Sequence, residues 1–176
     1  RSILPQEIEI NPIISGETEI RSAIDRFYGY EMSVDGIIKE LETGIIDYAS
    51  LNSEAEYNQP IVRLVNSILT DAVKKGASDI HFEPEEKFLR LRYRIDGVMR
   101  QIKSLNRDYW SAMTVRLKVI SNMNIAEAKM AQDGRITLKI SGRQVDFRCA
   151  SQPTKWGENI VLRILDREKS MVPLEN

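Results

Sequence analysis

The strongest constraint on the fold is an alternation of residue types between positions 88 and 96. The apolar residues Leu89, Leu91, Tyr93 and Ile95 alternate there with Arg90, Arg92, Arg94 and Asp96. Successive side chains leave a β-strand on opposite faces, so this segment predicts a strand with one packed face and one face that carries three arginines. A sheet built from such strands needs a cover of helices on one face only.

Helices that could supply this cover are predicted on both sides of the strand. Pro60 suits the first position of a helix, and Gly76 suits its stop. Between them one apolar stripe repeats at spacings of three and four, formed by Ile61, Leu64, Val65, Ile68, Leu69, Ala72 and Val73. We expect another long helix over 108–121. Two shorter helices are also expected, one that starts at Glu19 and one over 33–41.

The remaining pattern predicts an antiparallel sheet. Turn signals at Asp96-Gly97 and Ser141-Gly142 separate short segments with strand patterns. The expected strands cover 79–82, 88–95, 98–102, 135–140, 143–150 and 159–165. Helices and hairpins in this order predict an α+β fold, an antiparallel sheet with helices packed on one face. Residues 1–14 are expected to be extended, and 42–59 to form a linker.

Charge is unevenly distributed along the chain. The net charge is −1 over 176 residues, but residues 1–60 contain 4 Lys/Arg and 12 Asp/Glu, whereas residues 61–176 contain 21 and 14. An acidic unit therefore precedes a basic unit, with the change near Pro60. Two ordinary solvated surfaces would give this pattern, and so would a basic unit that faces phosphate or an acidic partner.

Several kinds of active site are excluded by composition. None of the nine glycines is followed by lysine, so the chain has no G-x-x-x-x-G-K-[ST] loop for nucleotide phosphates. This segment alone is therefore not expected to be catalytic. With one histidine (His81) and one cysteine (Cys149), no metal site is expected. The basic half lacks the basic-aromatic alternation of stacking platforms, so no nucleic-acid partner is expected.

Four motifs in the basic half carry a family resemblance. They are GASDIHFEP (76–84), RYRIDG (92–97), QDGRI (132–136) and GENIVLRILD (157–166). In this order and at these spacings they strongly resemble the signature of the secretion ATPases that drive type II secretion and type IV pilus assembly. The resemblance is strong over about 57–176 and weaker over 15–45.

This resemblance implies a division of the chain. Residues 1–56 would be the end of a helical N-terminal domain and a linker. Residues 57–169 would be a second N-terminal domain, a PAS-like antiparallel sheet with helices on one face. Residues 170–176 would be the connector to a RecA-like ATPase domain, which would hold the phosphate loop.

The resemblance also implies site residues. Two arginines of the PAS-like domain reach the nucleotide phosphates in this family, and the matching positions are Arg148 and Arg163. Guanidinium combines charge with a planar fork of donors, which suits the charge of phosphoryl transfer. The alternative is that both are surface arginines without a ligand.

Other prominent residues are open to two interpretations. Arg90, Arg92 and Arg94 form either a solvated sheet face or a contact with a neighbouring subunit. Trp156 either packs locally or lies at an interface. Asp79 and His81 are expected to be structural, Asp79 by fixing a turn and His81 through local hydrogen bonds.

The function implied by the resemblance is that of a regulatory and subunit-contact part of a hexameric motor. The parent would use ATP and Mg²⁺, contact its own RecA-like domain and neighbouring subunits, and dock on the cytoplasmic domain of an inner-membrane platform protein. It would be cytoplasmic and peripherally bound to the bacterial inner membrane. The rival hypothesis is a stand-alone PAS-like sensing or interaction module, which an enclosed apolar pocket would favour.

Overall fold

The computed structural model describes residues 14–16, 20, 33–43 and 60–165. Its helices there are α2 (Val34–Thr43), α3 (Pro60–Lys74) and α4 (Tyr109–Ile120). Its strands are β1 (Asp79–Pro84), β2 (Phe88–Ile95), β3 (Val98–Asn106), β4 (Gln132–Ile140), β5 (Arg143–Thr154) and β6 (Gly157–Leu165). Apart from Ile20, the expected helix from Glu19 lies outside the described residues, as do most of the extended start and of the linker.

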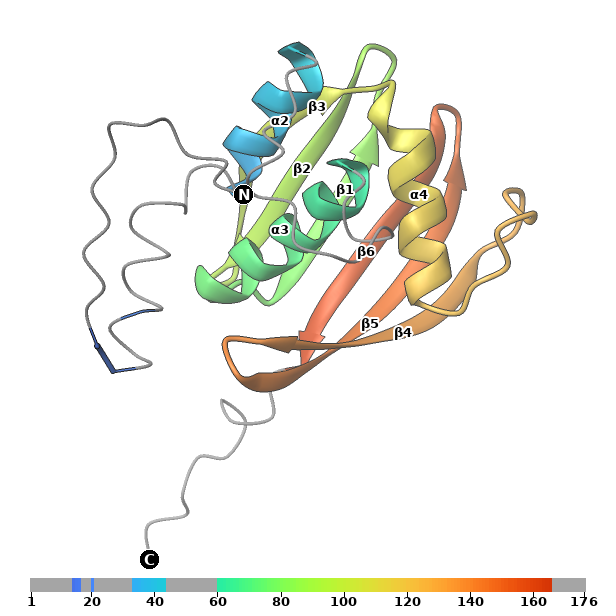
Figure 1. Ribbon diagram of the computed structural model, residues 1–176. Coiled ribbons are helices and arrows are strands. Elements are labelled where there is room, and N and C mark those ends of the chain that lie inside the picture. Colours follow the sequence, from blue (N-terminus) through green and yellow to red (C-terminus); the bar gives the residue numbers. More distant parts are fainter. Residues whose placement is uncertain (1–13, 17–19, 21–32, 44–59, 166–176) are drawn as a thin grey trace, which may run out of the picture.

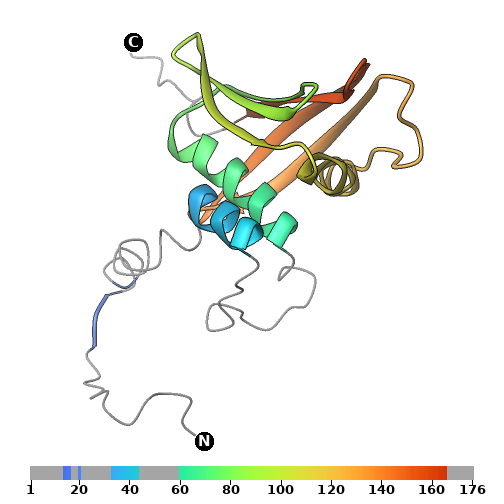
Figure 2. The same cartoon turned by 90° about the horizontal axis from the view of Figure 1, so that it is seen from above.

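The six strands form a single antiparallel sheet in the order β3-β2-β1-β6-β5-β4. Helices α3 and α4 lie across one face of this sheet, and α2 lies beside α3 (Figure 1). Seen from above, the three helices are all on the same side (Figure 2). The predicted α+β fold with helices on one face is therefore confirmed.

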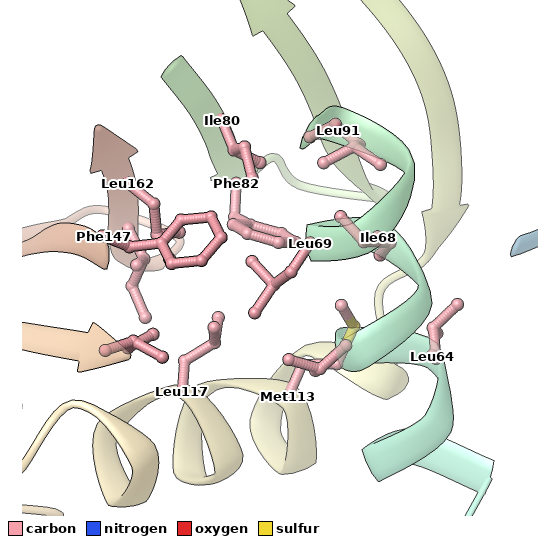
Figure 3. Close-up of a cluster of buried hydrophobic side chains, with 14 of the residues drawn as sticks. Leu64, Ile68, Leu69, Ile80, Phe82, Leu91, Met113, Leu117, Phe147 and Leu162 are labelled. Carbon is pink, nitrogen blue, oxygen red and sulfur yellow. The ribbon is translucent and has the colours of Figure 1, made fainter. Parts of the chain in front are cut away.

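The hydrophobic core lies between this face and the helices. The predicted stripe of α3 is buried, with Leu64, Ile68 and Leu69 fully enclosed. These side chains meet Phe82 of β1 and Met113 of α4 (Figure 3). Burial of large apolar side chains in one continuous cluster is the main source of stability for a domain of this size. Alternate residues of each strand are thereby turned to the opposite, uncovered face.

Helix α2 shares this core. Ile37 and Ile38 are buried in the same cluster, and Glu40 forms an ion pair with Arg63 of α3. The hydroxyl of Ser33 accepts a hydrogen bond from the backbone N–H of Gly36 in the first turn, as expected of a residue that precedes a helix. The division of the chain into two domains between residues 56 and 57 remains a prediction. In this structure α2, which precedes that boundary, packs against α3, which follows it.

Both predicted turns are present, with positive φ at Asp96 (50°) and Gly97 (77°) and at Ser141 (51°) and Gly142 (81°). Positive φ at both central residues is the requirement of a tight type I′ hairpin.

Five strands are longer than the sequence pattern predicted. β1 extends to residue 84, β3 extends to 106, β4 begins at 132, β5 extends to 154 and β6 begins at 157. Each extension pairs with a neighbouring strand along its whole length. Backbone pairing, rather than apolar alternation, sets the length of these strands.

None of the helices in the described ranges is long and apolar enough to cross a membrane.

Candidate functional site

A row of charged residues crosses the uncovered face of the sheet. Arg135 of β4 lies directly opposite Arg148 of β5, and Arg148 lies opposite Arg163 of β6. Arg163 in turn faces Asp79 of β1, and Asp79 faces Arg94 of β2. Because residues directly opposite each other project to the same side of a sheet, all five side chains leave on one face. Four arginines and one carboxylate thus lie across five neighbouring strands.

Two hairpin turns produce this alignment. The Ser141-Gly142 turn starts the pairing at Ile140 and Arg143. The next turn contains only Lys155 and Trp156, and pairing starts again immediately after it. Each two-residue turn fixes the register of its hairpin, so the three arginines of β4, β5 and β6 are placed in line.

Asp79 is the anchor of the row. Arg163 Nε donates to its Oδ1 at 3.0 Å, Arg94 Nε lies 3.3 Å from Oδ2, and the Ser78 hydroxyl donates to Oδ2 at 2.8 Å. Burial raises the pKa of this carboxyl, but the Ser78 hydroxyl and the two arginines outweigh burial and hold its pKa below its usual range. Asp79 was expected to be structural, and it links three strands as well as contacting Ser78 in the preceding turn.

Arg148 and Arg135 differ from Arg163 in their surroundings. Both are exposed, and among the described residues neither guanidinium has a hydrogen-bond or ion-pair partner. Together they line an open hollow of about 590 Å³, whose other lining residues are Ser121, Asn122, Asp133, Gly134 and Cys149. Two arginines without an ion-pair partner among the described residues therefore lie next to each other on β4 and β5.

The three arginines of β2 have acidic partners nearby. Arg90 pairs with Glu85 at 3.1 Å, and Arg92 pairs with Glu83. Arg94 shares Asp79 with Arg163. Much of their charge is thus balanced within the domain. Their role in a subunit interface remains a prediction.

His81 is half-buried on β1 between Arg92 of β2 and Val161 of β6. Its Nδ1 lies 3.6 Å from Glu83 Oε1, which is too long for a hydrogen bond. Burial lowers the pKa of His81, which favours the neutral imidazole. The local hydrogen bonds expected for this side chain are not found among the described residues.

Trp156 lies in the β5–β6 turn and is half-buried. Lys155 Nζ is 4.6 Å from the centre of its ring, and Arg107 Nη2 donates to its backbone carbonyl at 2.8 Å. Both cations lie within the range of a cation–π interaction. Local contacts therefore cover part of the Trp156 side chain. A role of Trp156 in a subunit interface remains a prediction.

Sequence reasoning missed two features of this region. Arg135 lies inside the QDGRI motif, but no role was assigned to it. The signal that could have identified it is the two-residue turn at 141–142, which places residue 135 opposite 148. The second feature is a buried ion pair, with Lys118 Nζ 2.7 Å from Glu158 Oε1. Its partners come from α4 and β6, and no local pattern connects them.

Within the described residues, no three side chains of His, Cys, Asp or Glu are grouped to hold a metal ion.

Residues 54–176 match the family model described as "Type II/IV secretion system protein". The chain is 40% identical over 169 residues to "Type IV pilus assembly ATPase PilB" of Myxococcus xanthus. This alignment covers 90% of this chain and 29% of the relative. It is 36% identical over 170 residues to "Type II secretion system protein E" of Pseudomonas aeruginosa, covering 92% and 34%.

A solved structure titled "Crystal Structure of the Pilus Retraction Motor PilT and Bound ADP" aligns at 21% identity with a TM-score of 0.39, over 61% of this chain and 32% of that one. The chain spans about a third of the length of the two relatives above. The family model covers more than half of the chain, and the four motifs lie inside the matched residues. The chain belongs to the type II/IV secretion system protein family.

Proposed function

We propose that this chain is the regulatory and subunit-contact part of a hexameric ATPase that powers type II protein secretion or type IV pilus assembly. Its membership of the family supports this, as do relatives whose names describe a pilus assembly ATPase and a type II secretion protein. Catalysis in this proposal belongs to a RecA-like domain of the parent protein, because this segment has no phosphate loop.

The observation that carries the proposal is the register of Arg148 opposite Arg163 on the uncovered face. Both residues are exposed and lie on neighbouring strands, on the face of the sheet that the described helices do not cover (Figure 2). Two like charges placed directly opposite each other destabilise a sheet unless an anion lies between them. Nucleotide phosphates held by the RecA-like domain supply such an anion, and the arginines would stabilise the charge that develops during phosphoryl transfer.

Asp79 offers a means of coupling nucleotide state to domain position. Arg163 is 68% exposed yet tied to a carboxylate that is only 7% exposed. An incoming phosphate would compete with Asp79 for this guanidinium, since both are anionic acceptors. Arg163 would then exchange an internal ion pair for a contact with the nucleotide as the domains close, which is a switch of the kind that drives domain movement.

The remaining parts of the proposal concern partners. ATP and Mg²⁺ would bind to the parent, and the RecA-like domains of the same and neighbouring subunits would face this domain. Arg90, Arg92, Arg94 and Trp156 are the candidate subunit contacts. The parent would dock on the cytoplasmic domain of an inner-membrane platform protein, and would be cytoplasmic and peripherally bound to that membrane.

No specific observation favours the rival hypothesis of a ligand-sensing module. Such a module needs an enclosed apolar pocket, and the space between the sheet and the helices is filled by fully buried side chains such as Leu69, Phe82 and Met113. The hollow beside Arg148 is open and lies on the surface.

The test uses the full-length parent protein. ATPase rates of the wild type, Arg148→Ala and Arg163→Ala are compared, with hexamer content measured by sizing. Each loss should be about tenfold or more with assembly intact, because a charge-assisted contact contributes roughly 1.5–3 kcal/mol. Lys139→Ala is the matched control, because it removes an exposed cation from the same face at a position opposite Gln144. Near-wild-type rates for both arginine variants would contradict the phosphate role.

A further inference from the structure

We infer that Arg135 is a further phosphate-binding residue, and that it forms with Arg148 a strip on β4 and β5 that binds a polyphosphate without help from other domains. The inference rests in part on the proposed function, because it assigns phosphate to Arg148. It adds a residue to which the sequence motifs gave no role, and it moves the centre of the site from β6 towards the edge strand β4.

Counter-charges are unevenly distributed along the row. Arg163 and Arg94 share the carboxylate of Asp79. Arg135 and Arg148 lie directly opposite each other, and among the described residues no carboxylate lies within 4.0 Å of either guanidinium. Like charges in directly opposed positions are destabilising. This pair is therefore the part of the row where a bound anion would relieve the most repulsion.

Arg135 and Arg148 both line the open hollow next to Ser121 and Asn122, at the place where α4 ends. The Asn122 side chain adds a polar group to the lining. Asp133 also lines the hollow but forms no ion pair with either arginine. Two cations and one carboxylate leave a net positive site, and its exposure suits a polyphosphate chain that reaches in from solvent.

The backbone at Arg135 is attached to the end of α4. The backbone N–H of Arg135 donates to the carbonyl of Ser121 at 3.2 Å. A Cβ at the neighbouring Gly134 would lie 2.3 Å from that carbonyl oxygen, so the glycine permits the close approach of β4 to the end of α4. The backbone under Arg135 is thus fixed before any ligand binds, and a preorganised site loses less entropy on binding.

The ligand class follows from these groups. Cross-strand neighbours are roughly 5 Å apart at Cβ, so adjacent phosphoryl groups of one di- or triphosphate can contact both guanidiniums. Planar guanidinium forks bind phosphate oxygens in bidentate pairs. A single carboxylate or sulfate would use only part of this strip.

The test uses the 176-residue chain with inorganic triphosphate as the probe. Binding is followed by two-dimensional NMR, through the arginine Nε–Hε and backbone amide signals, at low and moderate salt. The variants are Arg135→Gln, Arg148→Gln and the matched control Lys139→Gln, which lies on the same strand and face. Backbone spectra show whether each variant is folded.

The inference predicts saturable, millimolar-range binding by the wild type, with Kd raised about fivefold or more by each arginine variant and less than twofold by Lys139→Gln. Arg135→Lys should recover part of the loss. If Arg135→Gln behaves like the lysine control while Arg148→Gln weakens binding, the role of Arg135 is wrong and the proposed function stands. If wild-type signals do not saturate, the strip does not bind polyphosphate alone, and the ATPase test above decides the proposed function separately.

Discussion

Arg163 Nε lies 3.0 Å from Asp79 Oδ1, and this contact joins an exposed guanidinium of the row to a buried carboxylate. Arg94 approaches the other oxygen of the same carboxylate from the opposite side. Asp79 therefore holds β2, β1 and β6 together on the face that the helices do not cover. It also sets the electrostatic environment from which Arg163 would reach a ligand.

The first prediction concerns Asp79 and pH. Its pKa is lowered in the folded state, so the carboxylate contributes stability above its unfolded pKa, and this contribution is lost as pH falls through the lower, folded pKa. Asp79→Asn should lower the free energy of unfolding at pH 7 by about 1–3 kcal/mol, because charge-assisted hydrogen bonds are lost. The difference from wild type should shrink below pH 4.

Urea unfolding at pH 7 and at pH 3 measures this effect. Asp133→Asn is the control, because Asp133 is exposed on the same face and has no ion pair in the described structure. A gap between wild type and Asp79→Asn that stays constant down to pH 3 would show that ionisation of Asp79 does not stabilise the fold.

The second prediction concerns the buried pair of Lys118 and Glu158. Their charged atoms are 2.7 Å apart and both side chains are buried, and Lys118 Nζ also donates to the carbonyl of Glu127 at 2.5 Å. Removal of one partner leaves a buried charge without compensation, so Lys118→Met or Glu158→Leu alone should cost about 3–5 kcal/mol.

The double variant Lys118→Met/Glu158→Leu should cost much less than the sum of the single variants, because no unpaired charge remains. A double-mutant cycle by chemical denaturation checks this. Additive losses would mean that the two side chains stabilise the fold independently.

The third prediction concerns Gly134. A Cβ there would lie 2.3 Å from the Ser121 carbonyl oxygen and 2.9 Å from the Ser121 Cβ. Gly134→Ala should therefore force β4 away from the end of α4 and lower stability by about 1–3 kcal/mol. Thermal unfolding measures the loss, with Lys139→Ala on the exposed side of the same strand as the control. A Tm equal to that of wild type would show that this contact can relax without cost.

The fourth prediction concerns Cys149, which is buried on the packed face of β5. Burial raises the pKa of this thiol to about 12, against a smaller opposing effect of the Ser121 hydroxyl. Since the thiolate is the reactive species, iodoacetamide should leave the folded protein unmodified at pH 8 and alkylate it fully in guanidinium chloride. Mass spectrometry distinguishes the two states. Rapid alkylation of the folded protein would show that this part of the sheet opens readily.

Local sequence patterns predicted the fold class well, and the reasons are physical. The alternation around Arg92 and the stripe of α3 report which side of each element is buried, and burial on one side only implies helices on one face of a sheet. The two type I′ turns were also predictable, because residues such as Gly97 and Gly142 tolerate positive φ. Strand ends were predicted poorly, because the polar extensions of β4 and β5 are held by backbone pairing.

The sequence by itself determined the family motifs, the apolar faces and the identity of Arg148 and Arg163 as candidates. Only the tertiary structure decided which charges are neighbours. The pairing of Asp79 with Arg163 joins residues 84 positions apart, and the alignment of Arg135 with Arg148 depends on the register of a hairpin. Charge interactions act through space over a few ångströms, so their balance is fixed by strand order and register, which no local stretch of sequence contains.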